Sequence, residues 1–370
     1  MDDTDSVAEP DDSRRPVGHD GPPVGEPTGR PLRSATLSDV AREAGVSLAT
    51  ASRSLNGSNR TVREEYRQRV LAAARRLNYS ANHSAQAVAR GSSQTVALVV
   101  SDIADPYFSS IASGVMRSAE DEGLVVTMSI TERRPEREAE LVRALRGMRP
   151  RSLILVGSRR SDPRLTDELQ AELSAYEQAG GRVTVIAQPT MPFRTVAVRN
   201  TEAAAELAEQ LIGLGYRSMA VLGGPEHLLT ARDRVTGFVR RCAERGIEIP
   251  DRKIVHGEFT RDGGFVAAAE LHRRELADTE LVFAVNDVMA VGAMAYFRTA
   301  GLHLGREIAI AGFDDIETLR DVSPALTTVA LPLQRIGQLA VSLALSDNPA
   351  DLVVPVDGSV IIRESTPRRG

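Results

Sequence analysis

Two hydrophobic periods run along this chain. Residues 36–80 place apolar side chains at helical spacing with only short breaks, whereas from Thr95 onward short β-rich runs alternate with amphipathic helical stretches. The β-rich runs are almost continuously apolar, which is typical of parallel sheets covered by helices on both faces. They are too numerous for one compact sheet. We therefore expect an α-helical module followed by a two-lobed α/β core with parallel sheets.

The pattern predicts residue ranges for the strands and helices of the α/β core. The expected strands are Thr95–Ser101, Leu124–Ile130, Ser152–Gly157, Arg182–Ala187, Thr195–Arg199, Ser218–Gly223, Leu281–Asn286, Glu307–Phe313 and Ser359–Arg363. Helices expected between them include Tyr107–Glu122, Glu202–Leu214, Arg232–Arg245 and Asp287–Ala300.

Capping residues mark the helices of the N-terminal module. Thr36 and Asp39 have the spacing of a capping box that opens a first helix, and Gly45 closes it. Ser47 then caps a second helix, and a third is expected over residues 62–77. Two short helices joined by a tight glycine turn form a helix-turn-helix.

Charge is distributed unevenly along the chain. Residues 1–35 carry eight Asp/Glu and four Lys/Arg, whereas residues 36–91 carry nine Arg against four Asp/Glu, within a net charge of −5. A small basic segment on an otherwise acidic chain indicates a face made for a polyanion. A helix-turn-helix meets duplex DNA through its second helix, which fits the major groove. The alternative is an ordinary helical hairpin with a solvated basic face.

The first 35 residues differ from everything that follows. They contain six Pro and four Gly and almost no aliphatic run, so we expect a disordered acidic tail. A functional acidic tail is the alternative. The sequence thus predicts a tail over 1–35, a DNA-binding headpiece over 36–81 and a linker over 82–93. The first lobe is expected over 94–194 with 333–355, and the second over 195–326 with 356–366.

Composition narrows the setting of the protein. Cys242 is the single cysteine, so no intramolecular disulfide is possible, and the six His have no metal-ligand spacing. No apolar run approaches the roughly 20 residues of a membrane span, and the acidic start lacks a signal peptide's pattern. We expect a cytoplasmic protein with no cofactor and no metal site.

The segment TLSDVAREAGVSLATASRSLN, residues 36–56, resembles the headpiece motif of the lactose-repressor family of bacterial transcription regulators almost residue for residue. The resemblance continues over about 330 residues and leaves out only the acidic tail. It implies a core like that of periplasmic binding proteins, with a ligand in the cleft between two lobes. It also implies a homodimer that binds palindromic operator DNA, with helices such as Tyr107–Glu122 at its interface.

The resemblance assigns roles in DNA binding by position. Arg53 matches a base-reading position, where it suits a bidentate contact to guanine, while Leu48 and Ala49 match positions that offer apolar contacts. The positions that match sugar–phosphate or supporting contacts are held by Leu37, Thr50, Ser52 and Asn56.

The linker that begins at Asn82 resembles the family's hinge helix, which inserts an apolar side chain into the minor groove. That position, usually Leu, is held here by Val88. Because Val is shorter and β-branched, we expect a weaker wedge and a smaller kink in the DNA.

Polar and aromatic side chains follow several expected strands, where open α/β sheets bind ligands. Phe108 follows the first strand and either stacks on a ligand or caps the core. Asn286 and Asp287 follow a later strand, and Asp314 the next one, with helix capping as the alternative role for Asp287. The resemblance adds Arg234, at the family's effector-gripping arginine, and Phe259, where the family stacks an aromatic ring.

These features predict a DNA-binding regulator, most simply a repressor, controlled by a small-molecule effector. A carbohydrate is the expected effector and a nucleobase the alternative; the sign of its effect on DNA binding is open. The sequence shows neither a phosphate-binding loop nor a nucleophile elbow, which speaks against an enzyme. A sugar-binding transport or sensor protein without a DNA role is the main rival, and a flavodoxin-like enzyme is the other.

Overall fold

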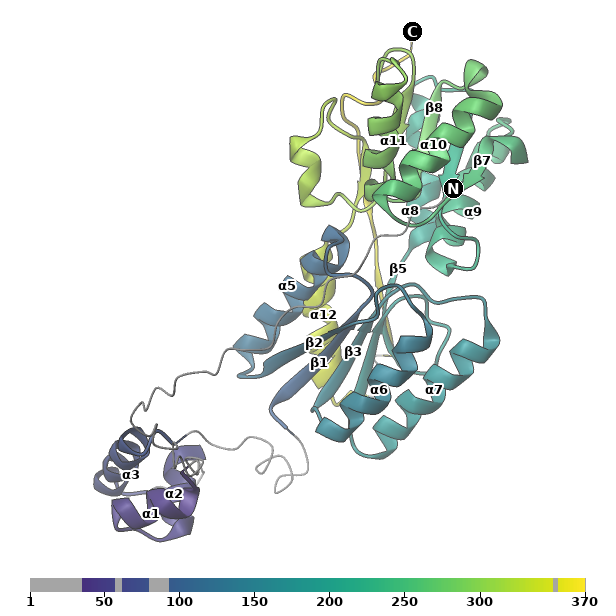
Figure 1. Cartoon of the computed structure of the whole chain (residues 1–370). Coiled ribbons are helices and arrows are strands. Elements are labelled where there is room, and N and C mark those ends of the chain that lie inside the picture. The colour runs from purple at the N-terminus through teal and green to yellow at the C-terminus, as the bar shows by residue number, and fades with distance from the viewer. Residues whose placement is uncertain (1–34, 57–61, 80–92, 349–351, 370) are drawn as a thin grey trace, which may run out of the picture. The chain divides into compact units, whose positions relative to one another are not determined.

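The computed structural model describes residues 35–56, 62–79, 93–348 and 352–369. The chain divides into two compact units, residues 1–81 and 82–370, and each is treated by itself (Figure 1). The smaller unit is helical, and the larger consists of two α/β lobes joined by three chain segments. No helix among the described residues is long and apolar enough to cross a membrane.

The described part of the smaller unit contains α1 (Leu37–Ala44), α2 (Leu48–Asn56) and α3 (Glu64–Arg76). The capping box is confirmed, because Thr36 Oγ1 accepts from Asp39 N and Asp39 Oδ2 accepts from Thr36 N at 2.9 Å. Gly45 ends α1 at φ 64°, a left-handed conformation that glycine adopts without strain. The three helices enclose a small core of Val40, Ala41, Ala44, Ala51, Val70, Ala73 and Ala74.

The first lobe is built on a six-stranded parallel sheet of order β11-β5-β4-β3-β1-β2. Helices cover both faces, α5 and α12 on one and α6 and α7 on the other (Figure 1). Alternate residues of β1 serve two separate cores: Leu98 packs on the α5–α12 side and Val99 on the α6–α7 side. Near-continuous apolar strands therefore reflect burial of both sheet faces.

The bounds of these elements follow closely from the sequence pattern. The strands are β1 (Thr95–Val100), β2 (Val125–Ile130), β3 (Ser152–Val156), β4 (Arg182–Ile186), β5 (Arg194–Val198) and β11 (Val353–Val356). The helices are α5 (Pro106–Asp121), α6 (Glu136–Met148), α7 (Pro163–Gln178) and α12 (Leu333–Leu345).

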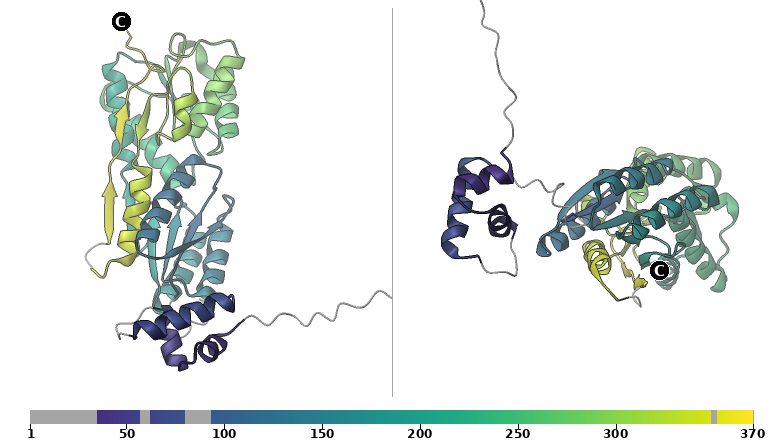
Figure 2. Two further views of the ribbon diagram at one scale, coloured as in Figure 1. Left: turned by 90° about the vertical axis from the view of Figure 1, so that its left-hand side faces the viewer. Right: turned by 90° about the horizontal axis from the view of Figure 1, so that it is seen from below.

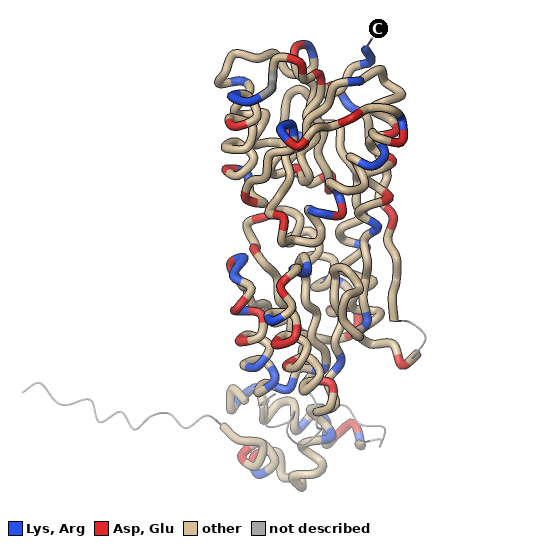
Figure 3. The backbone as a smooth tube through the Cα atoms, turned by 90° about the vertical axis from the view of Figure 1, so that its right-hand side faces the viewer, with Lys and Arg blue, Asp and Glu red and all other residues tan. Residues whose placement is uncertain are grey.

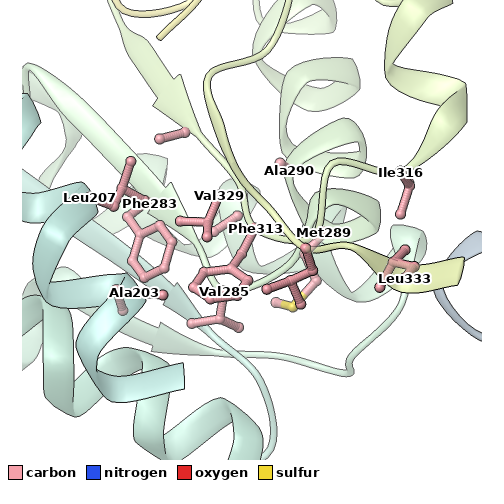
Figure 4. Close-up of a cluster of buried hydrophobic side chains, with 14 of the residues drawn as sticks. Ala203, Leu207, Phe283, Val285, Met289, Ala290, Phe313, Ile316, Val329 and Leu333 are labelled. Atoms are coloured by element: carbon pink, nitrogen blue, oxygen red, sulfur yellow. The ribbon is translucent and has the colours of Figure 1, made fainter. Parts of the chain in front are cut away.

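The second lobe has a four-stranded parallel sheet of order β7-β6-β8-β9, beside which helix pairs α8–α9 and α10–α11 pack (Figure 2). An antiparallel pair, β10 with β12, extends this lobe. Its core includes Phe283, Val285 and Phe313, which point toward one another in Figure 4.

The strands of this lobe are β6 (Met219–Gly223), β7 (Ile254–His256), β8 (Leu281–Ala284), β9 (Ala309–Ala311), β10 (Thr328–Ala330) and β12 (Ser359–Ile361). The helices are α8 (Asn200–Gly213), α9 (Leu229–Glu244), α10 (Arg261–Glu275) and α11 (Asp287–Thr299), with short 3-10 turns at Asp251–Lys253, Leu276–Asp278 and Glu317–Asp321.

Sequence and structure differ in the lobe boundary. The boundary expected between residues 194 and 195 is wrong, because it cuts β5, which pairs with β4 and β11 in the first sheet. The chain crosses to the second lobe only after Val198. The helical and β periods show where elements lie, but only pairing shows to which sheet a strand belongs.

Candidate functional site

Helix α2 presents an exposed face in the smaller unit. Leu48, Ala49 and Arg53 are all exposed, and the large apolar side chain of Leu48 is 51% exposed. Ser47 fixes the start of the helix, since its Oγ accepts from Thr50 N at 3.1 Å. A capped helix end with apolar and cationic side chains in the open suits the reading of base edges in a major groove.

The other residues expected to contact DNA are less exposed to solvent, or lie where their exposure is not described. Thr50 and Ser52 are half-buried on α2, and Leu37 packs against the small core from α1. Asn56 is the last residue of α2. Asn82 and Val88 lie outside the described residues, so the weak-wedge expectation remains a prediction.

A cavity of about 270 Å³ opens between the lobes of the larger unit. Its lining comes from the segments that follow β1, β2 and β3 in the first lobe and β6, β7, β8 and β9 in the second. The carboxyl ends of both parallel sheets therefore face one space, as ligand sites in open α/β folds do. Of the residues expected to bind an effector, the structure brings five to this cavity: Phe108, Arg234, Phe259, Asn286 and Asp314.

Arg234 lies in the wall of the cavity, with 2% of its side chain exposed. Its Nε donates to Asn200 Oδ1 at 2.9 Å and its Nη1 to the carbonyl of Val285 at 2.8 Å. The guanidinium carbon stands 3.8 Å from the centre of the Phe313 ring. Each of the three guanidinium nitrogens thus has a partner, which fixes the orientation of the group.

Asp314 is the counter-ion of Arg234. Its Oδ1 lies 2.9 Å from Arg234 Nη2, and its backbone has φ 120°, a region that side-chain-bearing residues rarely adopt. Burial raises the pKa of Asp314 to about 8, against the opposing effect of Arg234. Burial thus favours the protonated form of this carboxyl group, while the Arg234 guanidinium favours its ionised form.

The remaining expected residues shape the cavity. Asn286 caps α11, its Oδ1 accepting from Met289 N at 2.9 Å, which leaves the amide nitrogen to donate to a ligand. Phe108 packs edge-on against Tyr107 and also belongs to the first-lobe core, so it is both a core residue and a wall. Phe259 contacts Gly224 so closely that a Cβ there would overlap its ring.

Asp287 is not where the sequence suggested. Its carboxylate is fully buried away from the cavity lining, accepting from Thr328 Oγ1 at 2.7 Å and from Ile316 N at 3.0 Å. Burial raises its pKa to about 6. The expectation that it faces the crevice is therefore wrong: at a helix start, consecutive side chains point in different directions, and only Asn286 points toward the ligand space.

Several lining residues were missed by sequence reasoning. Arg133 bridges two carboxylates, Asp105 at 2.9 Å and Asp102 at 3.2 Å, at the edge of the cavity. Thr131 and Ser158 follow β2 and β3. The strand-end rule that was applied to Phe108 would have found them, had it been extended to every expected strand.

The two lobes also bond to each other directly beside the cavity. Leu229 N donates to the carbonyl of Arg159 at 2.9 Å, and Thr230 N donates to Ser158 Oγ at 3.0 Å. Gln188 reaches across to Thr230 Oγ1 at 2.8 Å. The cavity is therefore bounded by groups whose contacts depend on how the lobes are disposed.

Comparison with known proteins agrees with this architecture. Residues 36–82 match the model of bacterial regulatory proteins of the lacI family, and residues 208–366 match that of periplasmic binding protein-like domains. The transcriptional repressor CytR of Escherichia coli K12 is 31% identical over 340 residues, covering 90% of this chain and 96% of CytR. The chain belongs to the LacI family.

Other LacI-family proteins are similar over the same length. The E. coli K12 regulator GalR is 32% identical over 340 residues, covering 90% of this chain and 96% of GalR. The lac repressor dimer bound to operator and the anti-inducer ONPF has a TM-score of 0.79 at 25% identity, and covers 90% of this chain and 100% of its own. A CelR–cellobiose complex has a TM-score of 0.65 at 26% identity, covering 90% and 99%.

Membership confirms the expected family and fold class. The chain is a regulatory protein with a DNA-binding helix-turn-helix and a core like that of periplasmic binding proteins. Its relatives are transcription regulators rather than enzymes.

Proposed function

We propose that this protein is a sequence-specific repressor that binds a palindromic operator as a homodimer. The observation that carries the proposal is the exposed face of α2, where Arg53 can reach a base and Leu48 and Ala49 offer apolar contact. A structural relative was solved as a dimer on operator, and a twofold dimer matches a palindrome.

The dimer interface is proposed to include α5. Met116 on this helix is 42% exposed and Ile103, just before it, is 38% exposed, both beside the small residues Ala112 and Ser113. Two exposed apolar side chains on this helix and just before it suit contact with a second copy of the chain.

The effector is proposed to be a carbohydrate held in the interlobe cavity. Phe108 and Phe259 offer ring faces or edges for the apolar side of a sugar, while Asn286, Arg234 and Asp314 supply polar groups for hydroxyls. The CelR relative was solved with cellobiose. A purine base is the alternative ligand, because the same rings could stack on it.

The proposed control is a linkage through the crossovers between lobes. Arg234 bonds Asn200, the first residue of α8 after the crossover that follows Val198. Asp314 N donates to Val329 O at 2.8 Å, and Leu331 N to Asp314 O at 3.3 Å, just before the crossover into α12. A ligand on Arg234 and Asp314 therefore acts on two of the three connections that set lobe orientation.

Selection from a randomised duplex pool tests the DNA part of the proposal. The full chain is expected to enrich an inverted repeat, with one half-site per subunit. If no sequence is enriched over random duplex, with or without sugars and purines, the DNA-binding proposal is refuted and only a ligand-sensing function is left. Light scattering of the selected complex gives the stoichiometry, for which two chains per duplex are expected.

A further inference from the structure

Several arginines lie at the amino ends of strands β3, β4 and β5, where the chain from the DNA-binding unit enters the core. This end of the first-lobe sheet is called the entry edge. Arg149, Arg151, Arg182 and Arg194 lie just before or at the starts of β3, β4 and β5, and we call them the entry-edge arginines. The chain enters beside them: Ser93 N donates to the carbonyl of Arg149 at 3.0 Å, and Arg151 N donates to the carbonyl of Thr95 at 2.8 Å.

Two of these arginines form no ion pair within the described part of the chain. Arg149 and Arg151 are exposed, and neither has a carboxylate partner within ion-pair distance among the described residues. Arg182 is engaged by Asp347 and by the carbonyls of Leu345 and Ser346. Arg194 Nε is buried and has no hydrogen-bond partner in the part of the chain that the structure describes.

The local charge at this edge is therefore positive. Three arginines, led by Arg182 and followed by Arg151 and Arg194, hold the pKa of Asp347 below its usual range, so they share one carboxylate. Two acids of α7 lie nearby: Glu172 is already paired with Arg143 and Arg146, and Glu177 Oε1 accepts from Val183 N at 3.2 Å. Exposed acids Asp121 and Glu122 lie at the other end of the edge, before β2, and elsewhere on the larger unit the two signs are interspersed (Figure 3).

Arg149 also occupies a costly backbone position. It ends α6 at φ 51° and ψ 52°, the left-handed region where Gly or Asn is the usual residue. Other side chains are disfavoured there, because their Cβ comes too close to the following carbonyl oxygen. No contact of the guanidinium is present within the described part of the chain, and its exposure makes it available to a partner.

The partner that fits is the phosphate backbone of duplex DNA. Arginine binds phosphate by a planar, charge-assisted fork. DNA held by the helix-turn-helix is tethered to the core through residues 80–92, which raises its effective concentration at the point where Ser93 enters. Residues 1–35 are also acidic, with eight Asp/Glu against four Lys/Arg, but duplex DNA carries one negative charge per about 1.7 Å and is the denser polyanion.

We propose that Arg149 and Arg151 are auxiliary DNA-backbone contacts made by the core rather than by the headpiece. The proposal rests on operator binding by the headpiece and adds contacts that do not depend on sequence. Phosphate contacts release counterions, so each steepens the fall of log affinity with log salt by about 0.9. Removal of one such arginine–phosphate pair therefore reduces the drop in affinity across a fourfold rise in salt by a factor of about 3.5.

The test compares the full chain with Arg149→Gln/Arg151→Gln on the duplex selected by the wild-type chain and on a random duplex of equal length. The double variant is expected to lower the salt slope by about 2 per chain on both duplexes and to keep the ratio between them. Arg149→Lys/Arg151→Lys is expected to restore most of the slope because the charges return.

Arg164→Gln/Arg306→Gln is the matched control. Both arginines are exposed and have no carboxylate partner among the described residues; Arg164 lies in the first turn of α7, which follows the carboxyl end of β3, and Arg306 lies in the second lobe. This control is expected to keep the wild-type slope. Equal slopes for wild type and the Arg149/Arg151 variant, or an equal loss in the control, would overturn the proposal. Loss of operator preference in the wild type would instead refute the proposed function.

Discussion

Arg234 Nη2 and Asp314 Oδ1 lie 2.9 Å apart in the cavity wall, with 2% and 6% of their side chains exposed. The same arginine bonds Asn200, and the backbone of Asp314 pairs with the strand that leads to α12. One buried pair thus joins the ligand space to two of the connections between lobes.

Arg234→Lys is expected to destabilise the larger unit and to abolish the effector response. Lysine is a point charge and cannot serve Asn200, Val285 O and Asp314 together, and unmade bonds to a buried charged group cost about 2 kcal/mol or more. Urea unfolding of the full chain measures this. Arg240→Lys, on the exposed side of the same helix, should change stability by less than about 0.5 kcal/mol. Equal losses of stability in Arg234→Lys and Arg240→Lys would show that the buried hydrogen bonds of Arg234 do not stabilise the fold more than an exposed ion pair does.

Asp314→Asn is expected to change how stability depends on pH. Because the folded pKa of Asp314, about 8, lies above its unfolded value, the proton it holds stabilises the fold fully at low pH. That contribution is lost as pH rises through the folded pKa, at up to about 1.4 kcal/mol per pH unit. The cost of Asp314→Asn should therefore be greatest near pH 5 and shrink toward pH 9. Urea unfolding of the wild-type chain and the variant at pH 5 and pH 9 measures this cost. A cost that grows with pH would contradict a raised pKa for Asp314.

Arg53→Ala is expected to remove most operator preference while leaving effector binding intact. A bidentate contact to guanine discriminates by about 1–3 kcal/mol in each half-site. Fluorescence anisotropy with selected and random duplexes measures the preference. Arg67→Ala on α3, where the arginine is exposed and pairs with Glu64, should weaken both duplexes alike. If specific affinity survived Arg53→Ala unchanged, the assigned role of α2 would be wrong.

Gly224→Ala is expected to weaken effector binding. The added methyl would overlap Phe259 and come within 3.0 Å of Ala231, so the ring must move within the cavity, at an overpacking cost of about 1–3 kcal/mol. The ligand-induced rise in Tm should shrink. Gly147→Ala in α6 meets nothing within 4 Å, and should raise Tm slightly and keep the ligand-induced rise. An unchanged ligand response in Gly224→Ala would remove Phe259 from the site.

Local signals predicted much of the fold. The capping pair Thr36–Asp39 and the glycine turn at Gly45 depend on residues close in sequence, so the sequence predicted them directly. Strands β7, β10 and β11 were not expected, and β11 contains Pro355. Pro355 is tolerated there since β11 lies at the edge of the sheet.

The site was harder to predict than the fold. The rule that ligand-binding residues follow strands predicted Asn286 and Asp314 correctly. It could not show that Asn286 faces the cavity and Asp287 does not, because the direction of each side chain depends on where α11 begins. Asn200 was missed although it holds Arg234: it is one polar residue at the start of a helix, and only the crossover brings it beneath the cavity. Long-range pairing of this kind leaves no periodic trace in the sequence.

The most direct test of the whole account is the affinity of the full chain for its selected inverted-repeat duplex, measured with and without a ligand that raises its Tm. Monosaccharides, cellobiose and purine bases form the panel. We expect at least one to raise Tm and to change duplex affinity by roughly 5–150-fold, corresponding to a coupling of about 1–3 kcal/mol. Ligands that bind the cavity yet leave duplex affinity unchanged would contradict the account.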